Sequence, residues 1–332
     1  MKNAFLTVEA VGAMITSGAT LFISGPEALL RQLPRGKWIG GTTAYFILED
    51  GGVSREDRLF CTCFDEAMDV RTAILSSDQL SGLVERRYDH GFTCVMAPAF
   101  SGALQRYAVE GPGLPGLYDQ PVFGCVAGVR LDRVDTEMPK VFDGAAGTFS
   151  HDGLAALWVE LPETIEVDLD IVNLFTVGVG SEFSFAEGGF EVAECLVDGR
   201  PTNLARHIEE QGLDTRLPLV ADYAGAMINV SFQAVDADNG RVRFYAPVVP
   251  GVIYRLARPV ADYALAYVDA AKGRSAAGML SCNCILNYLY AELEGCSTGG
   301  FVGPVTFGEF AYILLNQTLS CLSLRDVPAE HK

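Results

Sequence analysis

The sequence predicts an α+β fold of two mixed α/β domains, with largely buried sheets that are covered by helices. Its 332 residues exceed the size of one typical hydrophobic core. Hydrophobic residues make up 49% and charged residues 20%, a balance typical of globular rather than disordered proteins. Many short segments are apolar at consecutive positions, which is typical of strands covered on both faces.

The first half of the chain is predicted to mix short strands with a few helices. Pro26 starts a short helix, because proline is favoured at a helix start, where its missing N–H needs no partner. Ser77 is a suitable N-cap for a second helix, which ends near His90 and Gly91. The expected strands are 11–24, 37–47, 58–64, 92–97, 121–131 and 153–161, and 110–121 is an expected loop.

The glycine-containing stretch 178–189 marks the expected boundary between a domain of residues 1–189 and a domain of residues 190–332. Further along, 230–235 and 241–245 are joined by DADNG, which predicts a β-hairpin. The other expected elements are strand 191–196, helix 201–211, helix 259–272, strand 277–282 followed by an amphipathic helix, and strand 318–324. The strands 277–282 and 318–324 are expected to be neighbours in the centre of one sheet, since both are apolar throughout.

The charge balance argues against nucleic acid and anionic membrane as partners. Lys and Arg number 24 against 42 Asp and Glu, which gives a net charge of −18, and both partners require clustered positive charge. Glu9 interrupts the apolar N-terminal stretch, so a secretory signal is not predicted, and no uncharged run is long enough to span a bilayer. We therefore expect a cytoplasmic protein.

Most of the nine cysteines lie inside apolar, strand-like runs. Their odd number and hydrophobic flanks predict reduced, buried thiols without a disulfide framework, bound metal or cofactor. Cys282 and Cys284 are two residues apart and precede an expected helix, whose dipole would lower a thiol pKa. They could form a reactive thiolate or, with Cys61 and Cys63, part of a metal site; the alternative is small thiols packed beneath the helix.

The last fifty residues contain the strongest candidates for a site. Glu309 and Asn316 are isolated polar residues in apolar runs, and Cys282 and Asn283 end a buried strand. Buried polar groups need partners in the protein, in water or in a ligand, because burying them unpaired is costly. A ligand amine could meet Glu309, although a salt bridge or a helix cap would also satisfy its carboxylate.

A second candidate is the run Gly40, Gly41, Thr42 and Thr43 in the N-terminal half. Its backbone N–H groups and hydroxyls could hold an anion or a carboxylate. A glycine bulge inside a strand explains the same residues equally well. The run lacks the lysine of a phosphate-binding P-loop.

Several of these segments resemble the FIST family of sensory domains. The similar stretches are Lys37–Ala44, the strand–turn–helix segment Phe190–Leu204, Met279–Cys282, and Phe307–Glu309 with Leu315–Leu319. The order and spacing of the motifs carry the resemblance, which is greatest over residues 190–324. It implies an N-terminal and a C-terminal half that bind a small ligand between them. Asn283, Cys284 and Ile285 stand where the family often has glycine and arginine, so the resemblance does not specify the ligand.

These observations predict a stand-alone sensory protein that binds a small, polar, amino-acid-like metabolite between its two halves. The expected ligand-binding residues are Gly40, Gly41, Thr42, Thr43, Cys282, Asn283, Glu309 and Asn316. One alternative is an enzyme with Cys282 as nucleophile and Glu309 as acid/base, although the sequence has no hydrolase, metalloprotease or nucleotide-binding signature. Another is a scaffold that binds a signalling protein partner and no small ligand.

Overall fold

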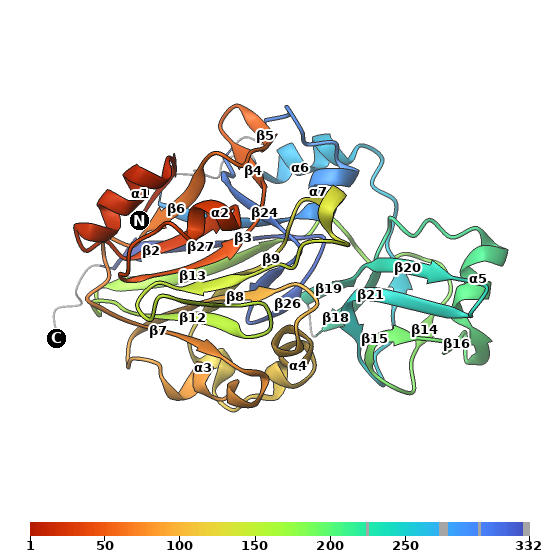
Figure 1. Cartoon of the computed structure of the whole chain (residues 1–332). Helices are drawn as coiled ribbons and strands as arrows, with labels where there is room; N and C mark the ends of the chain where they lie inside the picture. The colour runs from red at the N-terminus through yellow and green to blue at the C-terminus, as the bar shows by residue number, and fades with distance from the viewer. Residues whose placement is uncertain (224–225, 272–277, 298–299, 328–332) are drawn as a thin grey trace.

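The computed structural model describes residues 1–223, 226–271, 278–297 and 300–327. Among these residues, strands account for 43% of the structure and helices for 19%, in mixed sheets with helices packed on them, which confirms the α+β class. Figure 1 shows a larger body, which holds both termini, and a smaller lobe at the right. We call residues 183–256 the small lobe and the remainder the body.

Three six-stranded sheets form the body. The first contains, in order, β1 (Lys2–Leu6), β6 (Leu59–Cys63), β2 (Leu21–Gly25), β3 (Trp38–Thr42), β10 (Val141–Asp143) and β11 (Thr148–Ser150). The second contains β26 (Ile313–Leu315), β25 (Glu309–Ala311), β9 (Val122–Ala127), β8 (Gly91–Pro98), β12 (Leu154–Glu160) and β7 (Asp69–Leu75). The third contains β13 (Ile165–Val172), β27 (Leu319–Asp326), β23 (Met279–Cys284), β24 (Gly303–Thr306), β4 (Tyr45–Leu48) and β5 (Gly51–Ser54).

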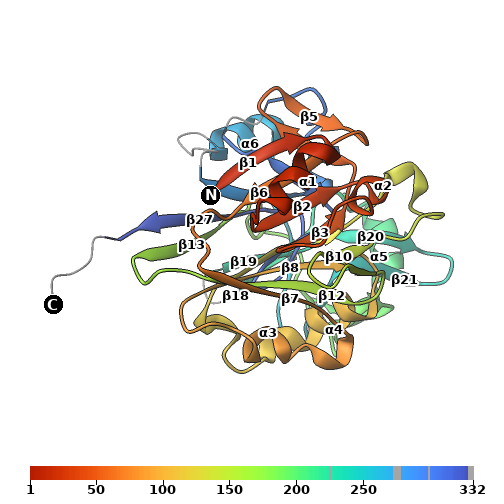
Figure 2. The same ribbon diagram turned by 60° about the vertical axis from the view of Figure 1, so that its left-hand side comes forward.

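One shared core joins the three sheets of the body. Phe22 and Ile39 of the first sheet, Phe92 of the second, and Leu280 and Leu322 of the third belong to the same buried cluster. The outer faces are covered by helices, as Figures 1 and 2 show. The helices are α1 (Val8–Thr16), α2 (Glu27–Leu30), α3 (Gly82–Glu85), α4 (Gly102–Glu110), α6 (Tyr263–Ala271) and α7 (Ile285–Tyr290).

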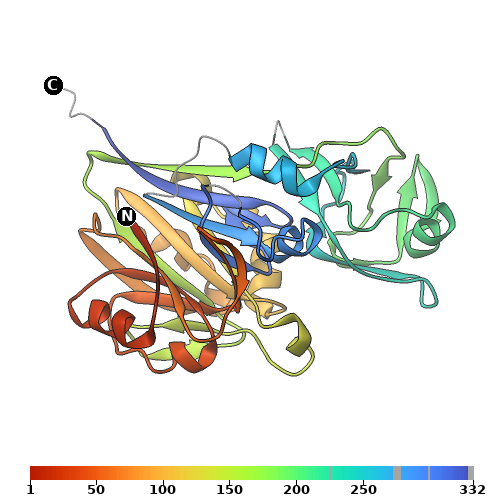
Figure 3. The ribbon, with the colours of Figure 1, turned by 90° about the horizontal axis from the view of Figure 1, so that it is seen from above.

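The small lobe has its own hydrophobic core, which includes Leu204, Ile208, Phe232, Phe244 and Tyr254. Figure 3 shows it projecting from one end of the body. Its three-stranded sheets are β14 (Phe183–Ser184), β16 (Glu194–Val197) and β17 (Arg200–Asn203); β15 (Gly189–Val192), β21 (Arg241–Val248) and β20 (Phe232–Asp236); and β19 (Ala226–Val230), β18 (Leu219–Tyr223) and β22 (Arg255–Leu256). Its helix is α5 (Leu204–Gln211).

Strands from distant parts of the chain complete the sheets of the body. In the third sheet, β27 pairs with β13 and β24 pairs with β4, and in the second sheet β25 pairs with β9. Two sheets therefore contain strands from both sides of residue 190. The division into 1–189 and 190–332 stays a prediction about the sequence.

The structure confirms the expected neighbours near the C-terminus. The strand β27 is internal in the third sheet and pairs antiparallel with β23, with Leu280 opposite Leu322. Ala277, the first residue of the expected strand, lies outside the described residues. The β20–β21 hairpin is also confirmed, with Asp236 opposite Arg241.

One expected strand is wrong. The segment 11–24 begins inside a helix, α1, and only its end forms β2. The buried residues of α1 are Val11 and Ile15, four positions apart, which is the spacing of one helix face. Thr7 accepts a hydrogen bond from the Ala10 N–H and caps the helix. None of the described helices has the length and apolarity needed to cross a bilayer.

Candidate functional site

Three of the predicted site residues meet in a buried polar cluster between the second and third sheets. Glu309, Cys282 and Asn283 have exposed fractions of 0%, 0% and 3%. Thr306 lies 3.0 Å from Cys282, measured from its Oγ1 to the sulfur, and donates a 2.8 Å hydrogen bond to the Gly308 carbonyl, beside Glu309. The cluster is therefore packed into the protein and does not open onto solvent.

The carboxyl group of Glu309 is only half satisfied. Thr318 donates from its hydroxyl to Oε2 at 3.2 Å, and Oε1 has no hydrogen-bond partner among the described residues. Burial raises the pKa of this carboxyl well above its ordinary value, so the neutral acid is favoured. The structure shows neither a salt bridge to Glu309 nor a helix-capping role for it among the described residues.

The two cysteines of β23 are buried, free thiols. Burial raises the pKa of both Cys282 and Cys284 well above the ordinary value. Of the two alternatives, the burial of both side chains fits small thiols packed beneath the helix α7, and burial is the largest cause of both pKa shifts. Since the thiolate is the nucleophilic form, Cys282 is poorly placed for covalent catalysis.

All nine cysteines are free, and all except Cys296 are buried. Cys61 and Cys63 lie in the first sheet, whereas Cys282 and Cys284 lie in the third. Within the described ranges, no group of three or more His, Cys, Asp or Glu side chains is arranged to hold a metal ion.

Asn283 takes part in an amide pair. Asn287 of α7 donates to Asn283 Oδ1 at 2.9 Å and to the Thr318 carbonyl at 2.8 Å. The Asn283 amide nitrogen has no partner within the described part of the chain. Thr318 thus connects this pair to Glu309.

Asn316 instead joins the body to the small lobe. Its Oδ1 accepts from the Ser231 N–H at 2.9 Å, and its Nδ2 donates to the Asn229 carbonyl at 3.1 Å. The neighbouring Gln317 accepts from the Ser231 hydroxyl at 2.7 Å and donates to the Arg216 carbonyl at 2.9 Å. We call Asn316, Gln317, Asn229 and Ser231 the amide latch. These hydrogen bonds satisfy the amide of Asn316, for which the sequence predicted a ligand as partner.

The Gly40–Thr43 run has a structural role in β3 and at the residue that follows it. The Thr42 and Thr43 N–H groups donate to the Lys140 and Gly25 carbonyls, so they are not available to an anion. The Thr43 hydroxyl donates to the Val305 carbonyl at 2.6 Å. A Cβ at Gly41 would lie 2.7 Å from the sulfur of Met96, so glycine allows the first and second sheets to approach closely.

Thr42 and Thr43 also line a surface hollow of about 40 Å³, together with Glu27, Glu56 and Glu137. Arg130 lines the same hollow, and the three glutamates are paired with Lys140, Arg130 and Arg133. Cys282, Asn283, Glu309 and Asn316 do not line this hollow.

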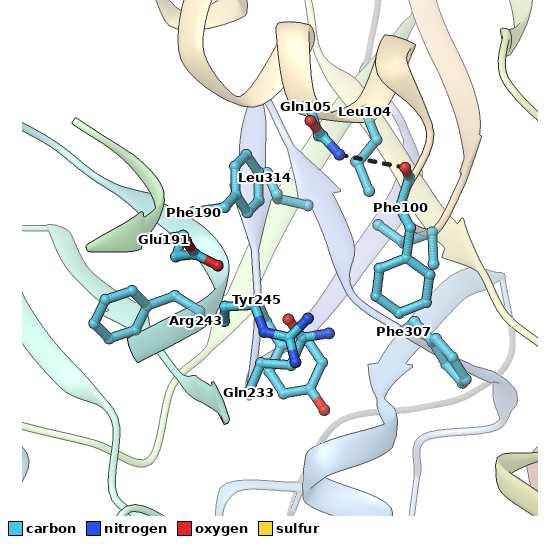
Figure 4. A pocket seen from close by; sticks show the side chains of 13 residues that line it. Phe100, Leu104, Gln105, Phe190, Glu191, Gln233, Arg243, Tyr245, Phe307 and Leu314 are labelled. Carbon is cyan, nitrogen blue, oxygen red and sulfur yellow. Dashed lines mark hydrogen bonds between the residues drawn. The ribbon is translucent and has the colours of Figure 1, made fainter. Parts of the chain in front are cut away.

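A more suitable cavity lies where the body meets the small lobe. It has a volume of about 220 Å³. Residues of the body, from 99–105, Val126 and 307–314, form one side, and residues of β15, β20 and β21 form the other. Figure 4 shows its side chains. We call it the junction cavity.

Aromatic side chains form much of its wall. Phe100 precedes α4, and its ring stands edge to face with Phe307, with 6.5 Å between the centroids. In Figure 4 these rings lie at the right, opposite Phe190 of β15. Phe100 is 49% exposed and has a φ of +66°, a conformation that is rare for a bulky residue. Such outliers cluster at ligand-binding places.

Most polar groups of the junction cavity come from the small lobe, and the body contributes Gln105 of α4, whose Nε2 donates to the Phe100 carbonyl. Arg243, Gln233 and Tyr245 gather near the centre of Figure 4. Burial raises the pKa of Tyr245 to about 12, so its hydroxyl stays neutral. Glu191 accepts a 2.8 Å ion pair from Arg241, whereas no carboxylate among the described residues lies within ion-pair distance of Arg243.

Sequence reasoning missed these residues, although one signal was present. Arg241, Arg243 and Tyr245 alternate along an expected strand and therefore share a face. Phe100 and Phe307 carry no comparable signal, because they come from loops far apart in sequence.

A second, larger cavity lies on the other side of Leu314. It has a volume of about 460 Å³ and is lined mainly by apolar side chains, including Val109, Ile228 and Pro247, with the tyrosines Tyr118 and Tyr223. The described residues that line it include no charged side chain.

The fold and the junction cavity define an α+β protein with a cavity between a body and a lobe. The chain matches the model of a family of unknown function, DUF6976, over residues 6–325, and it belongs to that family. A comparison with curated proteins found no match. The family has no assigned activity, so the resemblance to FIST domains stays a prediction.

Proposed function

We propose that this protein is a sensory protein that binds a small, polar, amino-acid-like metabolite in the junction cavity. The observation that carries the proposal is the cavity itself, whose walls come from both the body and the small lobe. Ligand sites favour such junctions, and they combine apolar walls with a few polar groups. The resemblance to FIST domains supports the same class of function.

The position of the cavity also supports a sensory role. A ligand that touches both sides binds best to one arrangement of the lobe, and that preference would shift the protein toward the ligand-bound arrangement. The change could then be read by a signalling protein partner. The burial of eight of the nine thiols supports a cytoplasmic location, where cysteines are kept reduced.

The enzyme alternative has less support from the geometry. Cys282 is fully buried, and burial raises its pKa, while its neighbour Glu309 is equally inaccessible. A substrate could reach neither group without a rearrangement of the core. The junction cavity, in contrast, is open to solvent, since Phe100, Glu191 and Arg243 on its rim are exposed.

A thermal-shift screen against amino acids, small carboxylates, nucleotides and metal ions tests the proposal. A ligand at 100 times its dissociation constant adds about 2.7 kcal/mol to the free energy of unfolding. Gln233→Trp should fill the cavity and abolish the shift. Gln211→Trp, at the exposed end of α5, is the matched control and should retain it. Equal ligand shifts in both variants would place the site elsewhere.

A further inference from the structure

The charge of the junction cavity narrows the class of ligand. Glu191 and Arg243 are opposite each other across β15 and β21, but Glu191 is held by Arg241 at 2.8 Å. Arg243 therefore remains as the cation of the cavity, with no carboxylate of the described residues within ion-pair distance, and Asp236 acts on it only as a neighbouring charge. What distinguishes Arg243 from other cations of the surface is that it lines a cavity, where its charge attracts an anion.

The geometry of a guanidinium favours a carboxylate. It presents a planar fork of N–H donors, which matches the two oxygens of a carboxylate. Gln233 and Tyr245 line the same cavity and add uncharged hydrogen-bonding groups. Glu191 is the carboxylate that the described lining residues include, and its ion pair with Arg241 makes it less available to a ligand ammonium.

The walls favour a flat ring. Phe100, Phe190 and Phe307 offer aromatic faces and edges, and aromatic pairs gain about 0.5–1.5 kcal/mol beyond their buried area. The volume of about 220 Å³ is small. Sites for drug-sized ligands span roughly 300–1,000 Å³, so the junction cavity suits a compact ligand.

From these features, and on the basis of the proposed function, we propose that the ligand is a small aromatic carboxylate. Its carboxylate pairs with Arg243, and its ring packs among Phe100, Phe190 and Phe307. Its carboxylate is required, whereas an amino group is not.

A series of ligands that share one ring separates these requirements. Isothermal titration with 3-phenylpropanoate, phenyllactate, phenylalanine and phenethylamine should show binding of the two acids. Phenylalanine should bind no more tightly than phenyllactate, and phenethylamine should not bind measurably. Butyrate, which keeps the carboxylate but lacks the ring, should bind at least about 10-fold more weakly than 3-phenylpropanoate.

Two variants test the assigned anchor. Arg243→Gln should weaken 3-phenylpropanoate binding by about 10- to 100-fold, as expected for the loss of a charge-assisted pair. Arg206→Gln is the matched control, because Arg206 is exposed on α5 of the same lobe and does not line the cavity. It should leave the affinity unchanged, and both variants should unfold at similar temperatures.

The outcomes separate this inference from the proposed function. The inference is overturned if phenethylamine binds as tightly as 3-phenylpropanoate, or if Arg243→Gln leaves the affinity unchanged. It is also overturned if none of the aromatic acids binds while another compound in the wider screen gives a shift that Gln233→Trp abolishes, and in that case the proposed function stands. If Gln233→Trp abolishes no ligand shift, both fail.

Discussion

At the scale of single residues, Glu309 illustrates how an acid can belong to a core. Burial favours the neutral form of its carboxyl group. Glu309 lies among Thr318, Thr306 and Cys282. The other titratable groups nearby are the buried thiols of β23 and the tyrosine hydroxyls of α6. A neutral carboxyl is a polar but uncharged group, so the core avoids the large cost of an isolated buried charge.

Glu309→Gln should change the pH dependence of stability. Burial raises the pKa of Glu309 in the folded protein above its pKa in the unfolded chain. The stability that the protonated Glu309 contributes is therefore fully present below the unfolded-state pKa and is lost as the pH rises toward the folded-state pKa. For one proton, the loss is about 1.4 kcal/mol per pH unit within that window. Glutamine cannot ionise, so the Glu309→Gln variant lacks this loss. Its free energy of unfolding, measured by urea titration, should rise relative to that of the wild type as the pH is raised from 4 to 8.

Glu210→Gln on the exposed face of α5 is the control for this experiment. A plot of its free energy of unfolding against pH should run parallel to that of the wild type. Parallel curves for Glu309→Gln would show that Glu309 is ionised in the folded protein. The ligand response should survive the substitution, because Glu309 does not line the junction cavity.

Cys296 should be the only thiol that reacts rapidly in the native protein, since the other eight are buried. Brief treatment with iodoacetamide followed by mass spectrometry should show the label at Cys296, and Cys296→Ser should remove the rapid phase. Cys282→Ser should leave it unchanged. Rapid labelling of Cys282 would revive the nucleophile hypothesis.

At the scale of elements, the hydrogen bonds of the amide latch connect the small lobe to the body. Residues 316–317 follow β26, so the latch and the cavity wall at Leu314 belong to one short segment. Gln317 has a φ of +55°, and its side chain binds the Ser231 hydroxyl and the Arg216 carbonyl of the lobe. Any movement of the lobe is therefore linked to this segment.

Asn316→Ala should lower the free energy of unfolding by about 2–4 kcal/mol, because it leaves the buried Ser231 N–H and the Asn229 carbonyl without partners. Urea unfolding measures the loss. The exposed turn residue Asn239 supplies the control, and Asn239→Ala should cost less than about 1 kcal/mol. A loss for Asn316→Ala no larger than that of the control would mean that water replaces the latch.

Local patterns predicted the elements whose signals lie within a short window. The DADNG turn identified the β20–β21 hairpin, and continuous apolar runs identified β23 and β27 as neighbours. The same logic failed at 11–24, where an i, i+4 pair of buried residues was hidden in an apolar run. Apolar runs of that length fit a buried strand or a buried helix face equally well.

The candidate site was predictable only in part. The sequence identified Glu309 and Asn316 as polar groups that require partners; Asn316 has them on both amide atoms, and Glu309 has one on Oε2. It could not reveal that protein groups supply those partners, since Ser231 lies 85 residues from Asn316. The junction cavity was beyond local reasoning, because its walls come from segments that only the tertiary fold brings together.

At the scale of the whole molecule, the net charge of −18 opposes the compact state through self-repulsion. Raising the salt concentration from about 10 mM to about 150 mM shortens the screening length from about 30 Å to about 8 Å. The melting temperature should therefore rise, by about 2–4 °C for a gain of about 1 kcal/mol. Calorimetry at several sodium chloride concentrations measures this.

Binding of 3-phenylpropanoate should respond to salt in the opposite direction, because screening weakens its attraction to Arg243. If added salt raises the melting temperature but weakens binding, the repulsion that comes from the net charge is distinguished from the attraction between the ligand and Arg243. A melting temperature that falls with added salt would show that surface ion pairs outweigh the repulsion.

The pairing of β13 with β27 also has a consequence for synthesis on the ribosome. Leu169 of β13 meets Leu322 of β27, which is made roughly 150 residues later, or about 10–30 s later at typical elongation rates. During that interval β13 lacks its only neighbour in the third sheet, because β13 is at the edge of that sheet. An unpaired strand edge can associate with other chains. Nascent chains of this protein should therefore depend on chaperones until β27 has emerged.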